Sequence, residues 1–390
     1  MATGTKSGLL EDGDRHAQSV FKHQVLRHYL KMFMAMTGST AEGKRVVVLD
    51  GFAGRGRYVD GRPASGELIL QAISDLKPSR QVAAFFVEKG RADYGVLADV
   101  VAEYAARGLD AQALPGLVED HLDQVVAKAE GVPLFLFLDP CGAGVSYERL
   151  VELLTGPRAR KRPQTEVLLN FSADMSRRIA GALARGRTDQ RAMDTACGGE
   201  WWRRVAEQAR QTSPDDTFEP VVHAVAAEYA RRVGAACRMM PVTIPVYRKL
   251  GHQPIYHLVF FTRSQYGLWV FGDAVGAARK EWLRHQGRMR DAEAGQTLWP
   301  HLQDMEERIE QEATRALDHA TANLRRQLAT GRPFQLVHRP RELFGMGYGI
   351  ATEATIIRAM RDLHDAGELE ILSSGARPRD TVVRAVRPGG

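Results

Sequence analysis

Short apolar runs of strand length alternate with helix-like segments through the first half of this 390-residue chain. Runs of Val, Leu and Phe without polar alternation are typical of strands buried on both faces of a parallel sheet. Alternation of such strands with helices predicts a doubly wound, Rossmann-like α/β sheet. The predicted strands are Arg45–Leu49, Ala83–Val87, Leu134–Leu138, Val167–Leu169, Ile255–Thr262 and Val242–Tyr247, and helical spacing appears around 16–36, 67–76, 90–107, 119–129, 146–154, 270–285 and 301–328.

Composition divides the rest of the chain. A polar, helix-like stretch at about 173–240 interrupts the sheet and predicts a helical insertion. After a Gly-Arg-Pro break, a helix, a glycine-rich turn, a second helix and two strands follow in the order of a winged helix. We therefore expect an α/β domain over 1–290, a charged linker helix over 291–330 and a winged-helix domain over 331–390.

A glycine-rich loop follows the first strand directly. The strand ends at Asp50 and opens into the sequence GFAGRG. Ligands of open α/β sheets bind at the carboxyl ends of the strands, and glycines there let the backbone approach a ligand closely. Glycines also simply turn chains, which is the alternative. The predicted cofactor-binding residues here are Asp50, Gly51, Phe52, Ala53, Gly54 and Gly56.

Two more acids end predicted strands. Glu88 ends the second strand, where an acid commonly binds the hydroxyls of an adenosine ribose, although a solvated acid is the alternative. Asp139 follows the strand LFLFL, and Pro140 restricts its backbone. Asn170 ends another strand, where it could face a substrate or form a turn. Asp139 is the predicted proton acceptor or orienting group, with Pro140 and Asn170 beside it.

The excess charge of the chain is local. The net charge is +6, and residues 156–210 hold twelve Arg and Lys against six Asp and Glu, an excess equal to that of the whole chain. A basic segment on a neutral body favours a polyanionic partner, whereas a set of solvated arginine-rich helices is the alternative. The predicted nucleic-acid-binding residues are Arg158, Arg160, Lys161, Arg162, Arg177 and Arg178.

The loop DGFAGRGRY, the acid Glu88 and the motif DPCG together resemble class I S-adenosylmethionine-dependent methyltransferases. The resemblance implies that S-adenosylmethionine is the cofactor. In the amino-methylating branch, Asp139 and the next carbonyl would accept hydrogens of the target amine. That branch carries D-P-P-aromatic, whereas this chain has Cys141 and Gly142 after Pro140.

A more extended resemblance covers about residues 17–285. The segments FKHQVLRHYL, DGFAGRGRYVDG, LDPCG, EVLLNF and YHLVFFT, in this order, are similar to the three-Cys-motif partner protein family. It implies a partner with a three-cysteine cluster that resembles radical S-adenosylmethionine enzymes. The first helix and the loop are also similar to a bacterial large-subunit ribosomal RNA adenine methyltransferase, which implies that Lys22 lies near the cofactor. A cation there would neutralise the methionine carboxylate.

Three functions remain open on the sequence. The first is a methyltransferase acting on nucleic acid or a nucleotide-like substrate. The others are a weakly active or inactive partner subunit of a three-cysteine radical enzyme, and a nucleic-acid-binding regulator that uses the winged helix. We expect a cytoplasmic protein, because the N-terminus has no apolar signal core and the apolar runs are too short for a membrane helix. The scattered cysteines predict no metal site.

Overall fold

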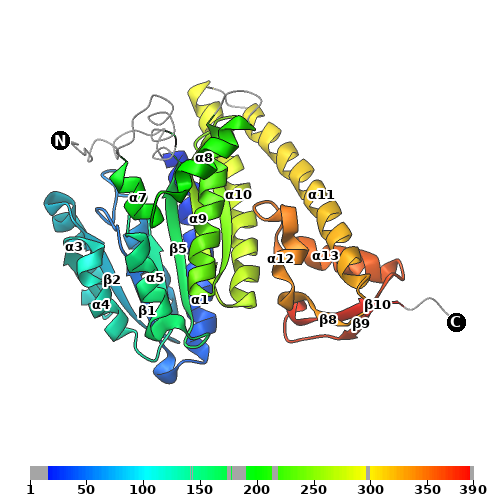
Figure 1. The fold of residues 1–390 in the computed structure, drawn as a ribbon, viewed down its shortest axis with the longest axis horizontal. Coiled ribbons are helices and arrows are strands. Elements are labelled where there is room, and N and C mark those ends of the chain that lie inside the picture. Colours follow the sequence, from blue (N-terminus) through cyan, green and yellow to red (C-terminus); the bar gives the residue numbers. More distant parts are fainter. Residues whose placement is uncertain are drawn as a thin grey trace. The chain divides into compact units, whose positions relative to one another are not determined.

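The computed structural model describes residues 16–140, 142, 144–173, 177, 190–212, 218–295 and 299–386. The chain forms two compact units (Figure 1). The first unit contains Leu30–Arg263, and the second combines Ser19–Tyr29 with the chain from Ser264 onward. Each unit is described by itself. Within the described residues, no helix is both long and apolar enough to cross a lipid bilayer.

A seven-stranded sheet forms the centre of the first unit. Its order is β3-β2-β1-β4-β5-β7-β6, in which the first five strands are parallel and β7 runs antiparallel to both of its neighbours. This arrangement confirms the predicted doubly wound α/β sheet. The strands are β1 (Arg45–Asp50), β2 (Gln81–Glu88), β3 (Asp110–Pro115), β4 (Leu134–Leu138), β5 (Thr165–Ser172), β6 (Met240–Tyr247) and β7 (Pro254–Thr262).

Helices cover both faces of this sheet. One face packs against a hydrophobic cluster to which the helices α4, α5, α7, α8 and α9 contribute. On the other face, Phe33 of α1 packs on Phe135 of β4 with 5.3 Å between ring centroids. The helices are α1 (His16–Ser39), α2 (Ser65–Leu76), α3 (Arg91–Ala106), α4 (Val118–Lys128), α5 (Tyr147–Thr155), α7 (Arg191–Cys197), α8 (Trp201–Gln211) and α9 (Glu219–Cys237).

The apolar runs of the sequence form the centre of the sheet. Val46–Leu49 of β1 and Leu134–Leu138 of β4 are almost fully buried. Each such side chain contributes about 1.5–3 kcal/mol relative to an exposed position, so the two central strands dominate the core energy. β3 was not predicted because its sequence, DAQALP, contains no apolar run; it pairs only with β2, at the edge of the sheet.

The polar stretch after β5 packs on the sheet. Its described helices α7, α8 and α9 bury Cys197, Trp202 and Val225 in the same hydrophobic cluster as β4 and β5. The Nε1 of Trp202 donates a hydrogen bond to Asp194 (2.8 Å). The expected insertion therefore extends the core of the first unit, although its outer surface is polar.

The second unit combines long helices with a small sheet. The sheet has the order β8-β10-β9, and both of its pairings are antiparallel. From Ser264 onward, the α-helices and strands are α10 (Gln265–Glu293), α11 (Pro300–Leu328), β8 (Phe334–Gln335), α12 (Pro340–Phe344), α13 (Glu353–Asp365), β9 (Leu369–Ser373) and β10 (Val382–Ala385). After α11 and the short strand β8, the elements follow the predicted order of helix, turn, helix and two strands.

Close contacts bind α10 and α11 to this unit. A Cβ at Gly276 would lie almost on the carbonyl oxygen of Ala351, so only glycine lets the backbones approach so closely. Trp269 packs edge-on against Phe344 at 5.4 Å. Ala316, Ala320 and Leu324 of α11 belong to the same hydrophobic cluster as α13. The helix α11, which we expected to be a linker, thus contributes to the core of the second unit. The domain boundaries at 290 and 331 remain a prediction.

Candidate functional site

The order of the strands determines where a ligand site is expected. Neighbours β2 and β3 lie on one side of β1, and β4 and β5 lie on the other, so the chain reverses its direction of winding between β1 and β4. Ligands of open α/β sheets bind at such a switch point, outside the carboxyl ends of the strands. The loop after β1 and the residues after β4 flank this point. We call this side of the sheet, formed by the ends of β1, β2, β4 and β5, the carboxyl edge.

Four predicted polar residues project from one face at the carboxyl edge. Asp50 lies in register with Phe86 of β2 and with Phe137 of β4, which itself lies opposite Leu168 of β5. Residues that are in register on neighbouring strands form a row, and their side chains point to the same face of the sheet. Side chains alternate along a strand, so the residue two positions after each of them points to that face again. Glu88, Asp139 and Asn170 each follow a member of this row by two positions. The structure therefore brings Asp50, Glu88, Asp139 and Asn170 to one face.

The glycine-rich loop needs its glycines for two reasons. A Cβ at Gly51 would lie 2.8 Å from Val118 Cγ2 and 2.9 Å from Leu138 Cδ2, so the loop passes too close to the core for a side chain. Gly54 and Gly56 have φ values of +58° and +72°, which favour glycine. Asp50 is fully buried, and its Oδ1 accepts a hydrogen bond from the Phe52 N–H (3.2 Å). The strand-end acid thus fixes the first turn of the loop.

Glu88 connects the loop to the second strand. Its Oε2 accepts a hydrogen bond from the Gly54 N–H at 3.1 Å, and its Oε1 accepts one from the Gly90 N–H at 2.6 Å. A carboxylate has about four acceptor positions, so both oxygens can accept further hydrogen bonds. A Cβ at Gly54 would meet nothing within 4 Å, which leaves open space beside this carboxylate. The arrangement fits a ligand that presents two hydroxyl groups.

An ion-pair network behind the loop was not predicted from the sequence. Arg57 donates hydrogen bonds to Glu67 of α2 at 2.6 and 2.7 Å and to Glu103 of α3 at 2.9 Å. Tyr104 also donates a hydrogen bond to Glu67, which is buried. The hydrogen bond to Glu67, followed by that to Glu103, raises the pKa of Arg57 above its usual value. The sequence alone contains no signal for this pair, because it depends on how α2 packs against the loop.

Asp139 and Asn170 form a pair across β4 and β5. The Asn170 Nδ2 donates a hydrogen bond to Asp139 Oδ1 at 2.7 Å, and the carboxylate can only accept, so the amide orientation is fixed. The amide oxygen of Asn170 is buried and accepts no hydrogen bond from any described residue. Asn170 also lines a cavity of about 10 Å³, together with Pro140 and Tyr229. This volume is near the lower limit for holding one water molecule.

A histidine pair lies next to this site and was also not predicted. His257 of β7 is opposite Phe171 and is almost fully buried. Its Nε2 lies 2.9 Å from Nδ1 of His223, whose Nε2 is 3.5 Å from Glu219. Burial, then the proximity of His223 and Arg177, lowers the pKa of His257 to about 3. His257 is therefore neutral at physiological pH.

The predicted phosphate-binding residues separate into different places. Arg158 is a correction, because its side chain is buried and donates to Thr165 and to the carbonyl oxygens of Ala129 and Val132. Burial, then Arg263, lowers the pKa of Arg158 to about 10. Arg158 therefore stabilises the loop before β5 and has no donor to offer to a phosphate.

The remaining cations of that set do not surround Asp139. Arg160, Lys161 and Arg162 are exposed and precede β5, whose start lies beside the start of β4, at the opposite edge of the sheet. Arg177 donates a hydrogen bond to the carbonyl oxygen of Pro254. Arg178 lies outside the described residues, as does Cys141.

Lys22 lies in the part of α1 that belongs to the second unit, so its role near the cofactor stays a prediction. The other predicted cofactor-binding residues lie in the first unit, as do Asp139, Pro140 and Asn170. No group of three His, Cys, Asp or Glu side chains in the described part of the chain is arranged to hold a metal ion.

No protein-family model matches the chain, and no curated protein matches it. Two of the solved structures that it resembles are named as methyltransferases. A protein assigned as a caffeoyl-CoA O-methyltransferase from Staphylococcus aureus is 9% identical, with a TM-score of 0.32 over 60% of this chain and 80% of that one. The methyltransferase domain of a bacterial Hen1 (CtHen1) is 10% identical, with a TM-score of 0.33 over 62% of this chain and 99% of that one.

A third structure is TYW2 of M. jannaschii in complex with S-adenosylmethionine (AdoMet). It is 12% identical, with a TM-score of 0.25 over 60% of this chain and 74% of that one. These identities and TM-scores are too low to show a family or an activity, so neither is taken from these proteins.

Proposed function

We propose that this chain binds S-adenosylmethionine and acts as a class I methyltransferase-like enzyme on nucleic acid or a nucleotide-like substrate. One observation carries the proposal: Asp50, Glu88, Asp139 and Asn170 project from one face at the switch point, beside a glycine-rich loop. Glycines for close backbone approach and an acid for hydroxyl groups are the two features that a nucleoside ligand requires.

The roles of the residues follow from their positions. Glu88 would accept hydrogen bonds from the ribose hydroxyls, and Gly51–Gly56 would contact the cofactor through their backbone. Asp50 keeps the loop in place from within the core. Arg57 would hold the far end of the loop through Glu67 and Glu103. When bound, S-adenosylmethionine supplies a reactive methyl group.

Asp139 and Asn170 would act on the acceptor. Asp139 would accept a hydrogen bond or a proton from an N–H or O–H group of the substrate. Asn170 restricts the carboxylate to one orientation through the 2.7 Å hydrogen bond, and its buried oxygen is available as a second acceptor. Pro140 limits the backbone of Asp139. Holding donor and acceptor in line accounts for most of the rate enhancement in such a reaction.

Three finer proposals accompany this function. The segment 331–390 would form a winged helix, supported by the order β8, α12, α13, β9, β10 and by the three-stranded antiparallel sheet. The protein would act in the cytoplasm. The similarity to the three-Cys-motif partner family would make a radical S-adenosylmethionine-like protein its partner.

A second candidate function is a partner subunit with little activity of its own. The residues after Pro140 favour it, because Cys141 and Gly142 provide no aromatic ring to stack on a base. The first candidate would transfer methyl groups to a substrate, whereas the second would transfer few or none. Copurification with a three-cysteine protein, together with cofactor binding but no transfer to any substrate, is expected for the second candidate alone.

Calorimetric titration with S-adenosylmethionine tests the first candidate. We expect binding by the wild type, loss of affinity in Glu88→Ala and unchanged affinity in Glu130→Gln, an exposed acid at the other edge. Methyl transfer from a tritiated cofactor to RNA, DNA and nucleotides should then be lost in Asp139→Asn while cofactor binding remains. A wild type that binds no cofactor, or a Glu88→Ala variant that binds as well as the wild type, contradicts the proposal.

A further inference from the structure

The edge of the sheet opposite the proposed cofactor site carries an unusual set of cations. We call it the amino edge; it is formed by the starts of β1 to β6, the end of β7 and the loops that adjoin them. The register places Arg45 beside Gln81, Leu134 beside Thr165, and Met240 beside Thr262. Exposed cations adjoin the sheet here at β1, β4, β5 and β6; they are Lys44, Arg45, Lys128, Arg160, Lys161, Arg162 and Arg238.

These seven cations have no carboxylate partners in the part of the chain that the structure describes. Elsewhere in this unit, exposed or half-buried arginines such as Arg57, Arg149 and Arg231 form ion pairs at 2.6–2.9 Å. None of the seven has an ion pair with a described residue. The exposed acids at the same edge that lack ion pairs are Glu42, Asp110 and Glu130. The amino edge therefore has an uncompensated positive charge.

Helix dipoles explain only part of this set. The helices of the unit run opposite to the parallel strands, so their carboxyl ends meet the amino edge, where a cation is favourable. Lys128 ends α4 and Arg238 follows α9, and both fit this explanation. The effect falls off within one turn. Arg160, Lys161 and Arg162 lie in the loop that runs into β5, and Lys44 and Arg45 precede or begin β1, so they need another reason.

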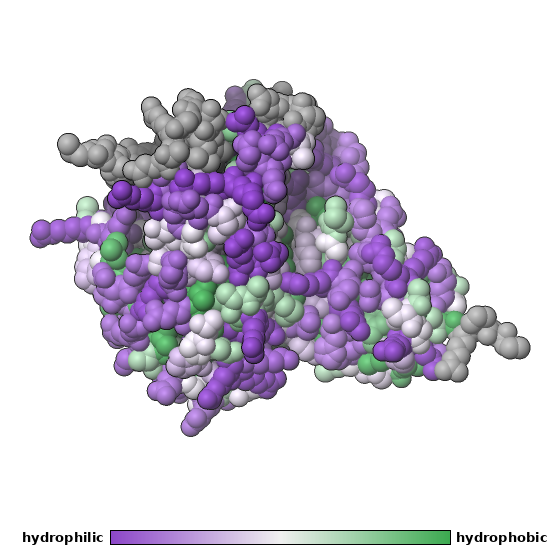
Figure 2. All heavy atoms as spheres, viewed as in Figure 1, coloured by the Kyte–Doolittle hydropathy of each residue, from purple (hydrophilic) through white to green (hydrophobic). Residues whose placement is uncertain are grey.

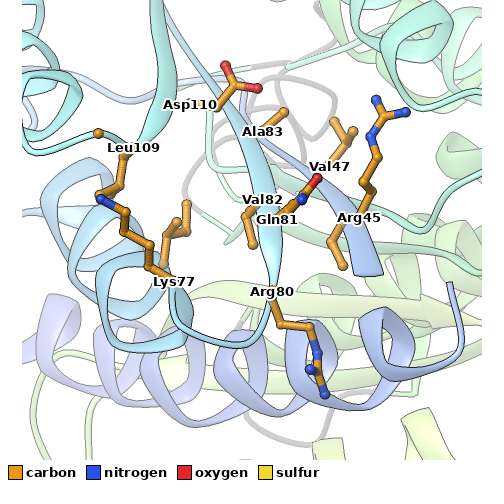
Figure 3. Close-up of a pocket in the computed structure, with 12 residues that line it drawn as sticks. Arg45, Val47, Lys77, Arg80, Gln81, Val82, Ala83, Leu109 and Asp110 are labelled. Atoms are coloured by element: carbon orange, nitrogen blue, oxygen red, sulfur yellow. The ribbon is translucent and has the colours of Figure 1, made fainter. Parts of the chain in front are cut away.

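A hollow at the same edge is not built for a small anion. A pocket of about 360 Å³ lies between the starts of β1, β2 and β3, and its charged lining residues are Arg45, Lys77, Arg80 and Asp110. Figure 3 shows that these side chains spread in different directions and do not converge on one point. Arg80 donates to the carbonyl oxygens of Ala35 and Ser79, and Lys77 donates to that of Arg107. Both side chains are thus already engaged with backbone oxygens.

We propose that the amino edge binds the phosphate backbone of a polynucleotide, at a place separate from the carboxyl edge. From β1 to β6 the edge spans four strand spacings, or about 19 Å. Each strand of a duplex has one phosphate for about every 3.4 Å of helix axis, so about six of them correspond to this length. The long side chains of Arg and Lys can follow such a row of charges without a preformed pocket.

A nucleic acid fits this surface better than a membrane. Surfaces that bind anionic lipids combine cations with apolar side chains that enter the bilayer. The large exposed hydrophobic residues of the described chain are Val59, Leu117, Trp299, Met346, Leu372 and Val386, and none belongs to the amino edge. The lower rim of the first unit in Figure 2, which corresponds to this edge, is coloured largely as hydrophilic.

The proposal does not depend on cofactor binding. A parallel strand of five to eight residues is on the order of 20 Å long, so phosphates at the amino edge do not contact Asp139. The acidic groups at the carboxyl edge would repel a phosphate backbone, while the amino edge attracts it. The surface is therefore a docking surface, and a bound polynucleotide would have to extend around the unit to reach the proposed reaction site.

Two matched double variants test the proposal in the full-length protein. Arg160→Gln/Arg162→Gln removes two cations from the amino edge. Arg204→Gln/Arg210→Gln removes two exposed arginines from α8, which lies in the same basic segment but away from this edge. Fluorescence anisotropy would measure binding of a 24-nucleotide RNA, a DNA of the same sequence and a six-nucleotide RNA at several salt concentrations. Calorimetry with S-adenosylmethionine on the same samples monitors the carboxyl edge.

We expect the first double variant to bind the better 24-mer about tenfold more weakly at 100 mM KCl, with a salt slope lower by about two. The control double variant should change affinity less than twofold, and cofactor affinity should stay the same in both. Tight binding of either RNA or DNA supports the proposal and identifies the polynucleotide. Equal losses in the two double variants, unchanged salt slopes, or a preference for vesicles of phosphatidylserine over both 24-mers would overturn it.

Discussion

At the carboxyl edge of the sheet the charged groups are held by partners, whereas at the amino edge seven exposed cations form no ion pair with any described residue. Glu88 is held by two backbone N–H groups, Asp139 by Asn170, and Arg57 by two carboxylates. Arg160, Lys161 and Arg162 are exposed and form no ion pair with another described residue. Groups fixed in one geometry suit a ligand whose atoms must be placed accurately. Mobile, unpaired cations suit a repetitive polyanion that requires only charge.

Removing one charge at each edge should affect stability very differently. Arg57→Gln leaves Glu67 buried without its ion pair, and we expect the free energy of unfolding to fall by about 3 kcal/mol. Arg160→Gln removes a solvated charge and should change it by less than about 0.5 kcal/mol. Urea unfolding of both variants measures the difference. Similar losses of stability in both variants would show that the cations of the amino edge are structural. The double variant Arg57→Gln/Glu67→Gln should recover part of the stability that Arg57→Gln loses.

Salt should separate the two edges in binding. Raising KCl from 50 to 200 mM should weaken polynucleotide binding by about 100-fold, as expected for about four phosphate contacts. Cofactor affinity should change by less than about threefold, because hydrogen bonds to fixed groups dominate that site. Anisotropy and calorimetry at both salt concentrations provide the comparison. A weak salt dependence of polynucleotide binding would contradict the proposed docking surface.

The role of Glu88 can be measured within the carboxyl edge. Glu88→Ala removes the acceptor for two ligand hydroxyls and a partner of the Gly54 N–H, and we expect about 30-fold weaker binding of S-adenosylmethionine. Glu88→Gln keeps one hydrogen-bond acceptor, so its affinity for S-adenosylmethionine should fall less than that of Glu88→Ala. Calorimetry on both variants, with Glu130→Gln as the control, gives the values. If Glu88→Ala binds with wild-type affinity, Glu88 is a loop anchor with no ligand contact.

His257 gives the smallest expected effect, and it concerns protonation. Its pKa is lowered to about 3 in the folded protein, against about 6.5 in the unfolded chain, so between these values the unfolded state binds the extra proton. The stability that His257 contributes is therefore complete above about pH 6.5 and is lost as the pH falls. Between pH 7.5 and 5.5 the free energy of unfolding should fall by about 1.4 kcal/mol more in the wild type than in His257→Leu. The exposed His252→Leu should behave like the wild type, and parallel losses in all three proteins would exclude this role for His257.

The sequence predicted those parts of the fold that local composition determines. The apolar runs identified β1, β2, β4, β5, β6 and β7, and the acids and glycines after them located the candidate site. β3 was missed because an edge strand needs little apolar surface, and DAQALP shows none. The pair of Arg57 and Glu67 was missed because it depends on how α2 packs against the loop, which the spacing of two residues does not reveal.

The basic segment shows a different limit. Arg158 is adjacent in sequence to three exposed cations, yet it alone turns inward to the carbonyl oxygens of Ala129 and Val132. Only the tertiary structure decides which member of a basic run is buried. The location of Arg160 could have been deduced, because residues that precede a parallel strand lie at its amino end.

The first helix has a consequence for synthesis of the protein on the ribosome. Within α1, Ser19–Tyr29 belongs to the second unit, and the remainder of that unit begins at Ser264. At about 5–20 residues per second, the ribosome reaches Ser264 roughly 10 to 50 s after it has made Tyr29. During this interval the apolar side chains of Val25, Leu26 and Tyr29 lack their final partners. The second unit therefore cannot complete its folding during translation from its C-terminal segment alone, and this part of α1, although made early, is among the last segments to reach its final environment.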